Sequence, residues 1–192
     1  MAKLLWVMIK TVVSLVLVIA FVLGCVAWAG HGGIANVYLA QASWLLVTII
    51  VLAACGLGWC GFALALAGAC LTVLIWSQVL VSFEAHWFER APIYVQWLFV
   101  LLPLLIGVLI GLIQGKDGML AAALTLSLGS IGLFPIQIWN VQSRVEGGWQ
   151  EWPSPAGGPY GVFMGAVIAY FLGAVAGWLG ERLRTRLRRQ TS

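Results

Sequence analysis

The most chemically mixed stretch of the sequence is residues 83–90, where Glu84, His86 and Glu89 lie close together. A histidine and two carboxylates are residue types that bind metal ions or transfer protons. Their spacing, however, is not the close histidine and carboxylate spacing of helical metal motifs. In a helix, Phe83, Trp87 and Arg90 would share a face instead. We therefore predict an interfacial helix, and a metal or acid–base cluster is the less favoured alternative.

Cysteine chemistry is the second candidate. All four cysteines, Cys25, Cys55, Cys60 and Cys70, lie inside apolar runs, and Cys55 and Cys60 do not form a Cys-x-x-Cys motif. We expect buried thiols rather than disulfides or a redox site. No Asp or Glu falls within a predicted span, so the sequence shows no carboxylate pathway for ions. The sequence predicts no catalytic residues and no metal site, and it leaves the cofactor unknown.

The elements that position these residues are apolar helices. The chain of 192 residues is 62% hydrophobic and only 8% charged, against about 25% charged in soluble domains. Its apolar residues occur in runs of about 20, the length that crosses a membrane as a helix. The Lys and Arg residues behind the net charge of +4 are sparse and segregated, so we expect no nucleic-acid binding. The predicted fold is all-α, a polytopic transmembrane helical bundle.

Residues 42–82 form one continuous apolar stretch. As a single helix it would be about 60 Å long, twice the hydrocarbon thickness. The glycines at 56, 58 and 61 offer a place to reverse, and we predict a short hairpin there. A single transmembrane domain, 1–180, then precedes a basic tail, 181–192. Its six predicted spans are 5–29, 42–58, 61–82, 94–114, 119–139 and 160–180.

The distribution of basic residues supports six spans. Short cytoplasmic loops carry an excess of Lys and Arg. With six spans and an internal N-terminus, eight basic residues are cytoplasmic and only Arg90 and Arg144 lie outside. Five spans would weaken the split to six against four. We predict cytoplasmic termini and a bacterial inner (plasma) membrane location.

Small residues recur at four-residue spacing in three of the predicted spans. In lipid, such strips let another helix backbone approach closely. Two interpretations stay open, packing within one subunit and packing between subunits. The predicted helix-packing residues are Gly61, Ala65 and Ala69; Gly107, Gly111 and Gly115; and Gly161, Gly165, Ala169, Gly173 and Gly177.

Aromatic and basic residues mark the two membrane surfaces. Most tryptophans, Trp44 among them, fall at the predicted outer interface, where an aromatic belt is expected. An outer aromatic site for a flat or cationic ligand is the alternative. The predicted ligand or partner contacts are Glu84, His86, Trp87, Trp149 and Trp152. The predicted lipid-binding residues are Arg184, Arg186, Arg188 and Arg189, with docking of a soluble partner or nucleic acid as the rival interpretation of this tail.

Our leading functional hypothesis is a noncatalytic membrane subunit that forms a homo- or hetero-oligomer through its small-residue strips. The second is a transport component for a small solute. In six spans, length and internal termini, the chain resembles the substrate-binding components of energy-coupling transporters, which implies solute binding. It departs from them in lacking an Ala-x-x-x-Ala strip in the first span. A membrane enzyme using His86 or His31 with a carboxylate ranks last.

Overall fold

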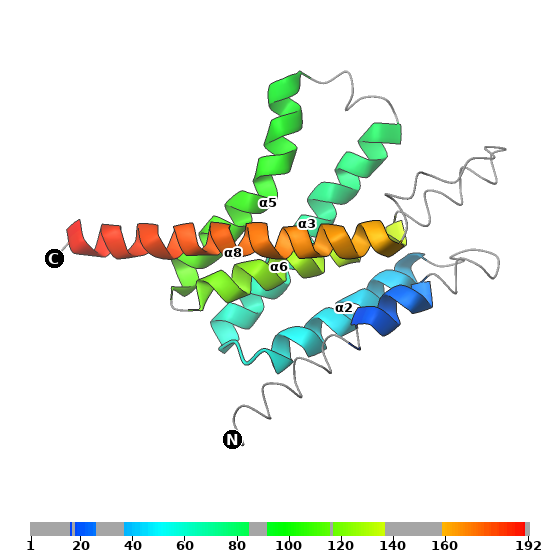
Figure 1. Cartoon of the computed structure of the whole chain (residues 1–192), viewed down its shortest axis with the longest axis horizontal. Coiled ribbons are helices and arrows are strands. Elements are labelled where there is room, and N and C mark those ends of the chain that lie inside the picture. The colour runs from blue at the N-terminus through cyan, green and yellow to red at the C-terminus, as the bar shows by residue number, and fades with distance from the viewer. Residues whose placement is uncertain are drawn as a thin grey trace.

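The described part of the chain is a bundle of helices. The computed structural model describes residues 16, 18–25, 37–84, 92–115, 117–136 and 159–190. The named helices are α2 Val37–Ala54, α3 Trp59–Glu84, α5 Ile93–Gln114, α6 Gly118–Gly132 and α8 Pro159–Gln190. Within these residues no strand occurs (Figure 1). The prediction of an all-α helical bundle is confirmed.

Three helices in the described part are long and apolar enough to cross a membrane. Their apolar stretches are Trp59–Ser77, Gly118–Ile136 and Phe163–Gln190. Shorter apolar stretches, Leu39–Ala54 and Leu101–Gln114, occupy α2 and α5. The chain is therefore a helical membrane protein. Its six crossings remain a prediction.

Two of the turns between helices contain a glycine in the left-handed conformation. The first follows α2 at Gly56, whose φ of 70° is in the left-handed region, and α3 begins at Trp59. The second follows α5 at Gly115, which also has a φ of 70° and whose N–H donates to the carbonyl of Gly111 at 3.0 Å. Glycine adopts this conformation without the steric cost that a Cβ would bring.

Both turns and the basic end of α8 lie at the same end of the bundle (Figure 1). A Cβ on Gly61, near the start of α3, would lie 2.5 Å from Nε2 of Gln114 at the end of α5. Glu181 of α8 contacts Met119 at the start of α6. Helices α3 and α6 therefore leave this end, and α2, α5 and α8 arrive at it. We call it the basic end of the bundle.

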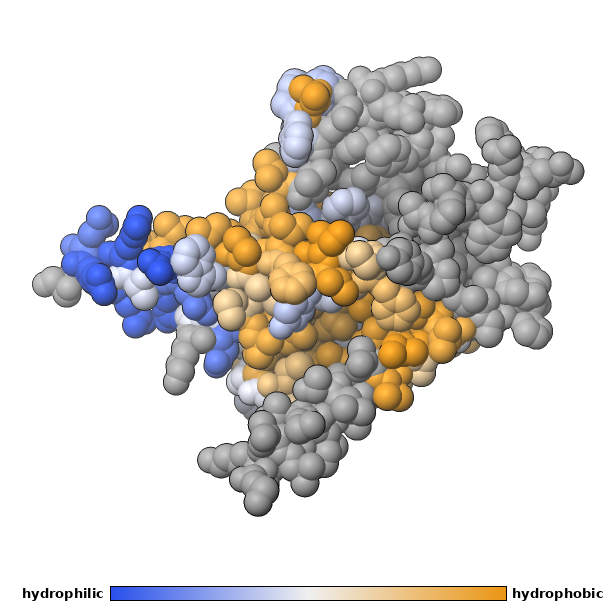
Figure 2. Space-filling view, in the orientation of Figure 1, coloured by the Kyte–Doolittle hydropathy of each residue, from blue (hydrophilic) through white to orange (hydrophobic). Residues whose placement is uncertain are grey.

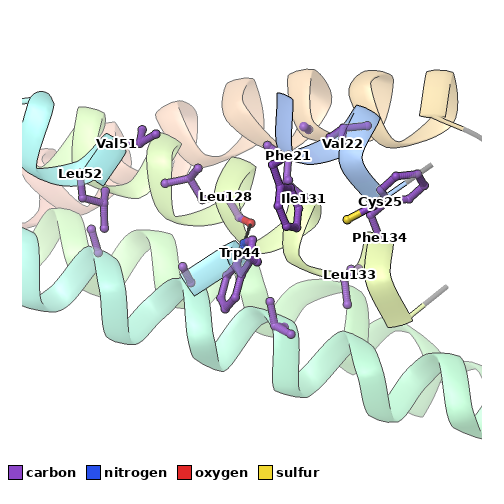
Figure 3. Close-up of a cluster of buried hydrophobic side chains, with 14 of the residues drawn as sticks. Phe21, Val22, Cys25, Trp44, Val51, Leu52, Leu128, Ile131, Leu133 and Phe134 are labelled. Atoms are coloured by element: carbon purple, nitrogen blue, oxygen red, sulfur yellow. Dashed lines mark hydrogen bonds between the residues drawn. The ribbon is translucent and has the colours of Figure 1, made fainter. Parts of the chain in front are cut away.

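Helix α6 is the central helix. Of its apolar stretch, 67% is buried, against 33% in α3 and 28% in α8. The main core lies beside it, where the first described segment, 18–25, meets α2 and α6 (Figure 3). Phe21, Val22 and Cys25 belong to the same buried cluster as Ile131 and Phe134. Residues 18–25, which belong to the predicted first span, thus contribute to the same core as α6.

Helix α8 does not end at residue 180, where the predicted span stops, but continues to Gln190. The residues beyond Gly180 are mainly Arg, Leu and Glu, which are strong helix formers. The face of the bundle shown in Figure 2 is mainly apolar between the grey residues, and the end of α8 is strongly hydrophilic. Exposed apolar residues include Leu101, Leu105 and Leu109 on α5 and Ile168, Leu172, Val175 and Leu179 on α8. Exposed apolar side chains of this kind suit contact with lipid.

Candidate functional site, a glycine-lined contact of three helices

Three glycines from three helices meet at the basic end. A Cβ on Gly118 of α6 would lie 2.6 Å from the Cα of Gly111 in α5. A Cβ on Gly177 of α8 would lie 2.7 Å from the carbonyl oxygen of Gly118, and one on Gly111 would overlap the carbonyl of Gly177. None of the three positions has room for a side chain. In lipid, where van der Waals packing is a main attraction between helices, this approach of backbone to backbone stabilises the bundle.

The close contact continues along α8 in both directions. A Cβ on Gly173 would lie 2.6 Å from the carbonyl oxygen of Ala122 in α6. A Cβ on Gly180 would overlap the carbonyl of Val108 in α5. One face of α8 therefore lies in the groove between α5 and α6 over at least two turns.

Two charged side chains of α8 bind the turn between α5 and α6. Oε1 of Glu181 accepts a hydrogen bond from the backbone N–H of Met119 at 2.9 Å. Nη1 of Arg184 donates to the carbonyl of Ile113 at 3.0 Å. The first N–H groups and last carbonyls of a helix have no partner within the helix. A carboxylate at the start of α6 and a guanidinium at the end of α5 also complement the two helix dipoles.

The four-residue repeat of α8 does not form one face. Four residues turn an α-helix through about 400°, so each repeat moves about 40° around the helix. Gly173 and Gly177 face α6 and α5, whereas Gly165 is exposed and a Cβ there would meet nothing within 4 Å. Ala169, between them, is half-buried. The environment of Gly161 lies outside the described part of the structure.

The other predicted strips lie inside the bundle. Ala65 and Ala69 of α3 are fully buried. The hydroxyl of Thr125 in α6 donates at 2.8 Å to Ala121 in its own helix and lies 3.3 Å from the carbonyl of Ala65. On α5, a Cβ on Gly107 would lie 2.9 Å from the Cβ of Ala176. These contacts join helices of one chain.

Two further glycine contacts, both in α6, are absent from the predicted strips, although Gly129 follows Ala121 and Thr125 at four-residue spacing. A Cβ on Gly129 would lie 2.7 Å from the Cβ of Thr72 in α3. A Cβ on Gly132 would lie 2.5 Å from the indole ring of Trp44. For Gly132, the sequence signal is only the presence of glycine within an apolar run.

Helix α2 is joined to α6 by side-chain hydrogen bonds. Nε1 of Trp44 donates to the carbonyl of Leu128 at 2.9 Å (Figure 3), and Nε2 of Gln41 donates to the carbonyl of Gly132 at 3.0 Å. Trp44 is only 4% exposed, so it belongs to the core and not to the predicted belt. One turn further along α2, Thr48 is fully buried and its hydroxyl has no hydrogen-bond partner.

Of the five predicted ligand or partner contacts, the structure describes only the backbone of Glu84. His86, Trp87, Trp149 and Trp152 lie outside the described residues, and Glu84 ends α3 with its side chain not described. No disulfide joins the four cysteines, and Cys60 is exposed. Within the described residues, no group of three His, Cys, Asp or Glu residues could hold a metal ion.

The predicted lipid-binding arginines differ in their surroundings. Arg184 is half-buried and bonded to α5, while Arg186, Arg188 and Arg189 are exposed. Arg182, which is absent from the predicted set, is also exposed, and its guanidinium lies 4.8 Å from the centre of the Trp178 ring.

Comparison with protein-family models, with curated proteins and with solved structures finds no match to this chain.

Proposed function

We propose that the protein is a noncatalytic membrane subunit that forms a homo- or hetero-oligomer through the outer half of α8. In this proposal, the contact of α5, α6 and α8 is an internal scaffold that holds α8 rigidly. The half of α8 further from the basic end is then presented to another transmembrane helix.

The observation that carries the proposal is the exposure of Gly165. It lies on the surface between Met164, which is 43% exposed, and Ile168, which is 54% exposed. A glycine costs about 1 kcal/mol relative to alanine within a helix, and here it makes no close contact in the described bundle. On a lipid-facing surface, its physical advantage is that a second helix backbone can approach closely.

We place this subunit in a bacterial inner membrane, with the basic end of the bundle in the cytoplasm. The predicted charge split of eight basic residues to two supports this orientation. The common location of both short turns and the arginine-rich end of α8 supports it as well (Figure 1).

The experiment compares Gly165→Leu with Gly173→Leu in one detergent, by native mass spectrometry and thermal unfolding. Gly165→Leu should dissociate the oligomer into folded subunits, and its unfolding temperature should fall less than that of Gly173→Leu, since only the contact between subunits is lost. Gly173→Leu should lower the unfolding temperature, because Leu would clash with the backbone of Ala122.

Val167→Ala is the control, since Val167 is 50% exposed on the same helix and projects about 160° away from Gly165. It should leave both measurements close to those of the parent protein. If the parent is a monomer, or if Gly165→Leu retains the parental oligomer, the proposed interface is wrong.

A further inference from the structure

The outward face of α8 changes from apolar to basic within one turn. Val175 and Leu179 are exposed on this face. At 100° per residue, Arg182 and Arg186 project within about 60° of the same direction, and both are exposed. The apolar surface and the two arginines therefore form one continuous strip along the helix.

Helix length places these arginines relative to the membrane. From Phe163 to Glu181 a helix rises about 27 Å, close to the hydrocarbon thickness of about 30 Å. Arg182 and Arg186 follow about 1.5 and 7.5 Å further along the axis. The headgroup layer is about 5 to 8 Å thick on each side. Both guanidinium groups thus reach the depth of lipid phosphates.

The two faces of this end of α8 have different roles. Arg184 points inward, where it donates to the carbonyl of Ile113 at 3.0 Å. Arg182 lies outward, over the ring of Trp178, which is 43% exposed. Tryptophan favours the interface between hydrocarbon and headgroups, and its ring attracts the cation. This contact holds the guanidinium of Arg182 beside the apolar strip.

We infer that Trp178, Arg182 and Arg186 form a binding site for the headgroup of an anionic phospholipid. Arginine presents a planar set of N–H donors that pairs with a phosphate through two parallel hydrogen bonds. The acyl chains of the same lipid lie along the exposed apolar residues of the strip. The site includes Arg182 and excludes Arg184, in contrast to the set that sequence alone indicates.

The experiment places the full chain in nanodiscs that contain equal amounts of phosphatidylcholine and phosphatidylglycerol. Native mass spectrometry then measures the ratio of the two lipids that the protein retains. Arg186→Gln should lower the preference for phosphatidylglycerol about fivefold, and Arg182→Gln with Arg186→Gln should lower it about 25-fold.

Arg188→Gln is the matched control, because it removes the same charge from a different face of the helix. It should change the preference less than twofold. Equal losses for Arg186→Gln and Arg188→Gln would show a diffuse effect of charge and overturn the site. An unchanged lipid preference in the double variant would also overturn the lipid site, and would indicate that these arginines bind a protein partner instead.

Discussion

The carboxylate of Glu181 accepts a hydrogen bond from the backbone N–H of Met119 at 2.9 Å, across 62 positions of sequence. Glu181 follows Gly177 by four residues, so the two lie on nearly the same side of α8. Gly177 packs on Gly118, the residue before Met119. The polar bond and the glycine contact therefore set the same register between α8 and α6.

Replacing Glu181 by Ala should lower the free energy of unfolding by about 1 kcal/mol, because the first turn of α6 loses a capping acceptor and a favourable charge. Glu181→Gln should lose less, since its carbonyl oxygen still accepts the bond. Thermal unfolding of the purified protein in detergent measures both. Parental stability in the Ala variant would show that the bond contributes nothing.

Gly177→Ala should destabilise the bundle by about 1 to 3 kcal/mol, the usual cost of overpacking. The new Cβ would lie 2.7 Å from both the carbonyl oxygen of Gly118 and the Cα of Met119. Gly24→Ala is the matched control, because Gly24 is an exposed helical glycine whose Cβ would meet nothing within 4 Å. Unfolding of both variants in the same denaturing detergent series tests the contrast, and equal stabilities would contradict the glycine contact.

Thr48→Val should leave stability unchanged or raise it by about 1 kcal/mol. The buried hydroxyl of Thr48 has no hydrogen-bond partner, so its removal abolishes a desolvation cost of about 1 to 3 kcal/mol. Thr125→Val makes the same exchange of hydroxyl for methyl, but removes the bond to Ala121 at 2.8 Å. It should destabilise by about 1 kcal/mol. If Thr48→Val lowers the free energy of unfolding as much as Thr125→Val does, the expected difference between the two hydroxyl groups is wrong.

Trp44→Phe should lower stability by about 1 kcal/mol or more, because the carbonyl of Leu128 loses the indole N–H and the smaller ring leaves a gap. Trp97→Phe is the control, since Trp97 is 58% exposed. Unfolding midpoints in one detergent distinguish them. If the two variants prove equally stable, Trp44 does not act as a core residue.

The orientation of the bundle can be tested with topology reporters. One inserted at Gly58, in the turn before α3, and one fused after Gln190 should both report the cytoplasm. One inserted in the 145–158 segment should report the opposite side. A Gly58 reporter on the opposite side from the C-terminal one would contradict the common end of the bundle seen in Figure 1.

Sequence alone determined the class of the protein and much of its division into helices. Apolar runs of about 20 residues have one stable form in lipid, a helix that satisfies its own backbone hydrogen bonds. The length of the 42–82 stretch required an interruption, and Gly56 supplies the left-handed residue of the turn that follows α2.

Only the tertiary structure decided which small residues are in contact. Because four residues exceed one helical turn, Gly165 and Gly177 project about 120° apart, and the placement of α5 and α6 determines which of them is covered. The tertiary structure also decided the partners of Glu181 and Arg184, which the sequence places in a basic tail. Their partners are an N–H and a carbonyl at helix ends distant in sequence, and every helix end has such groups. Which end lies within reach depends on how the helices pack.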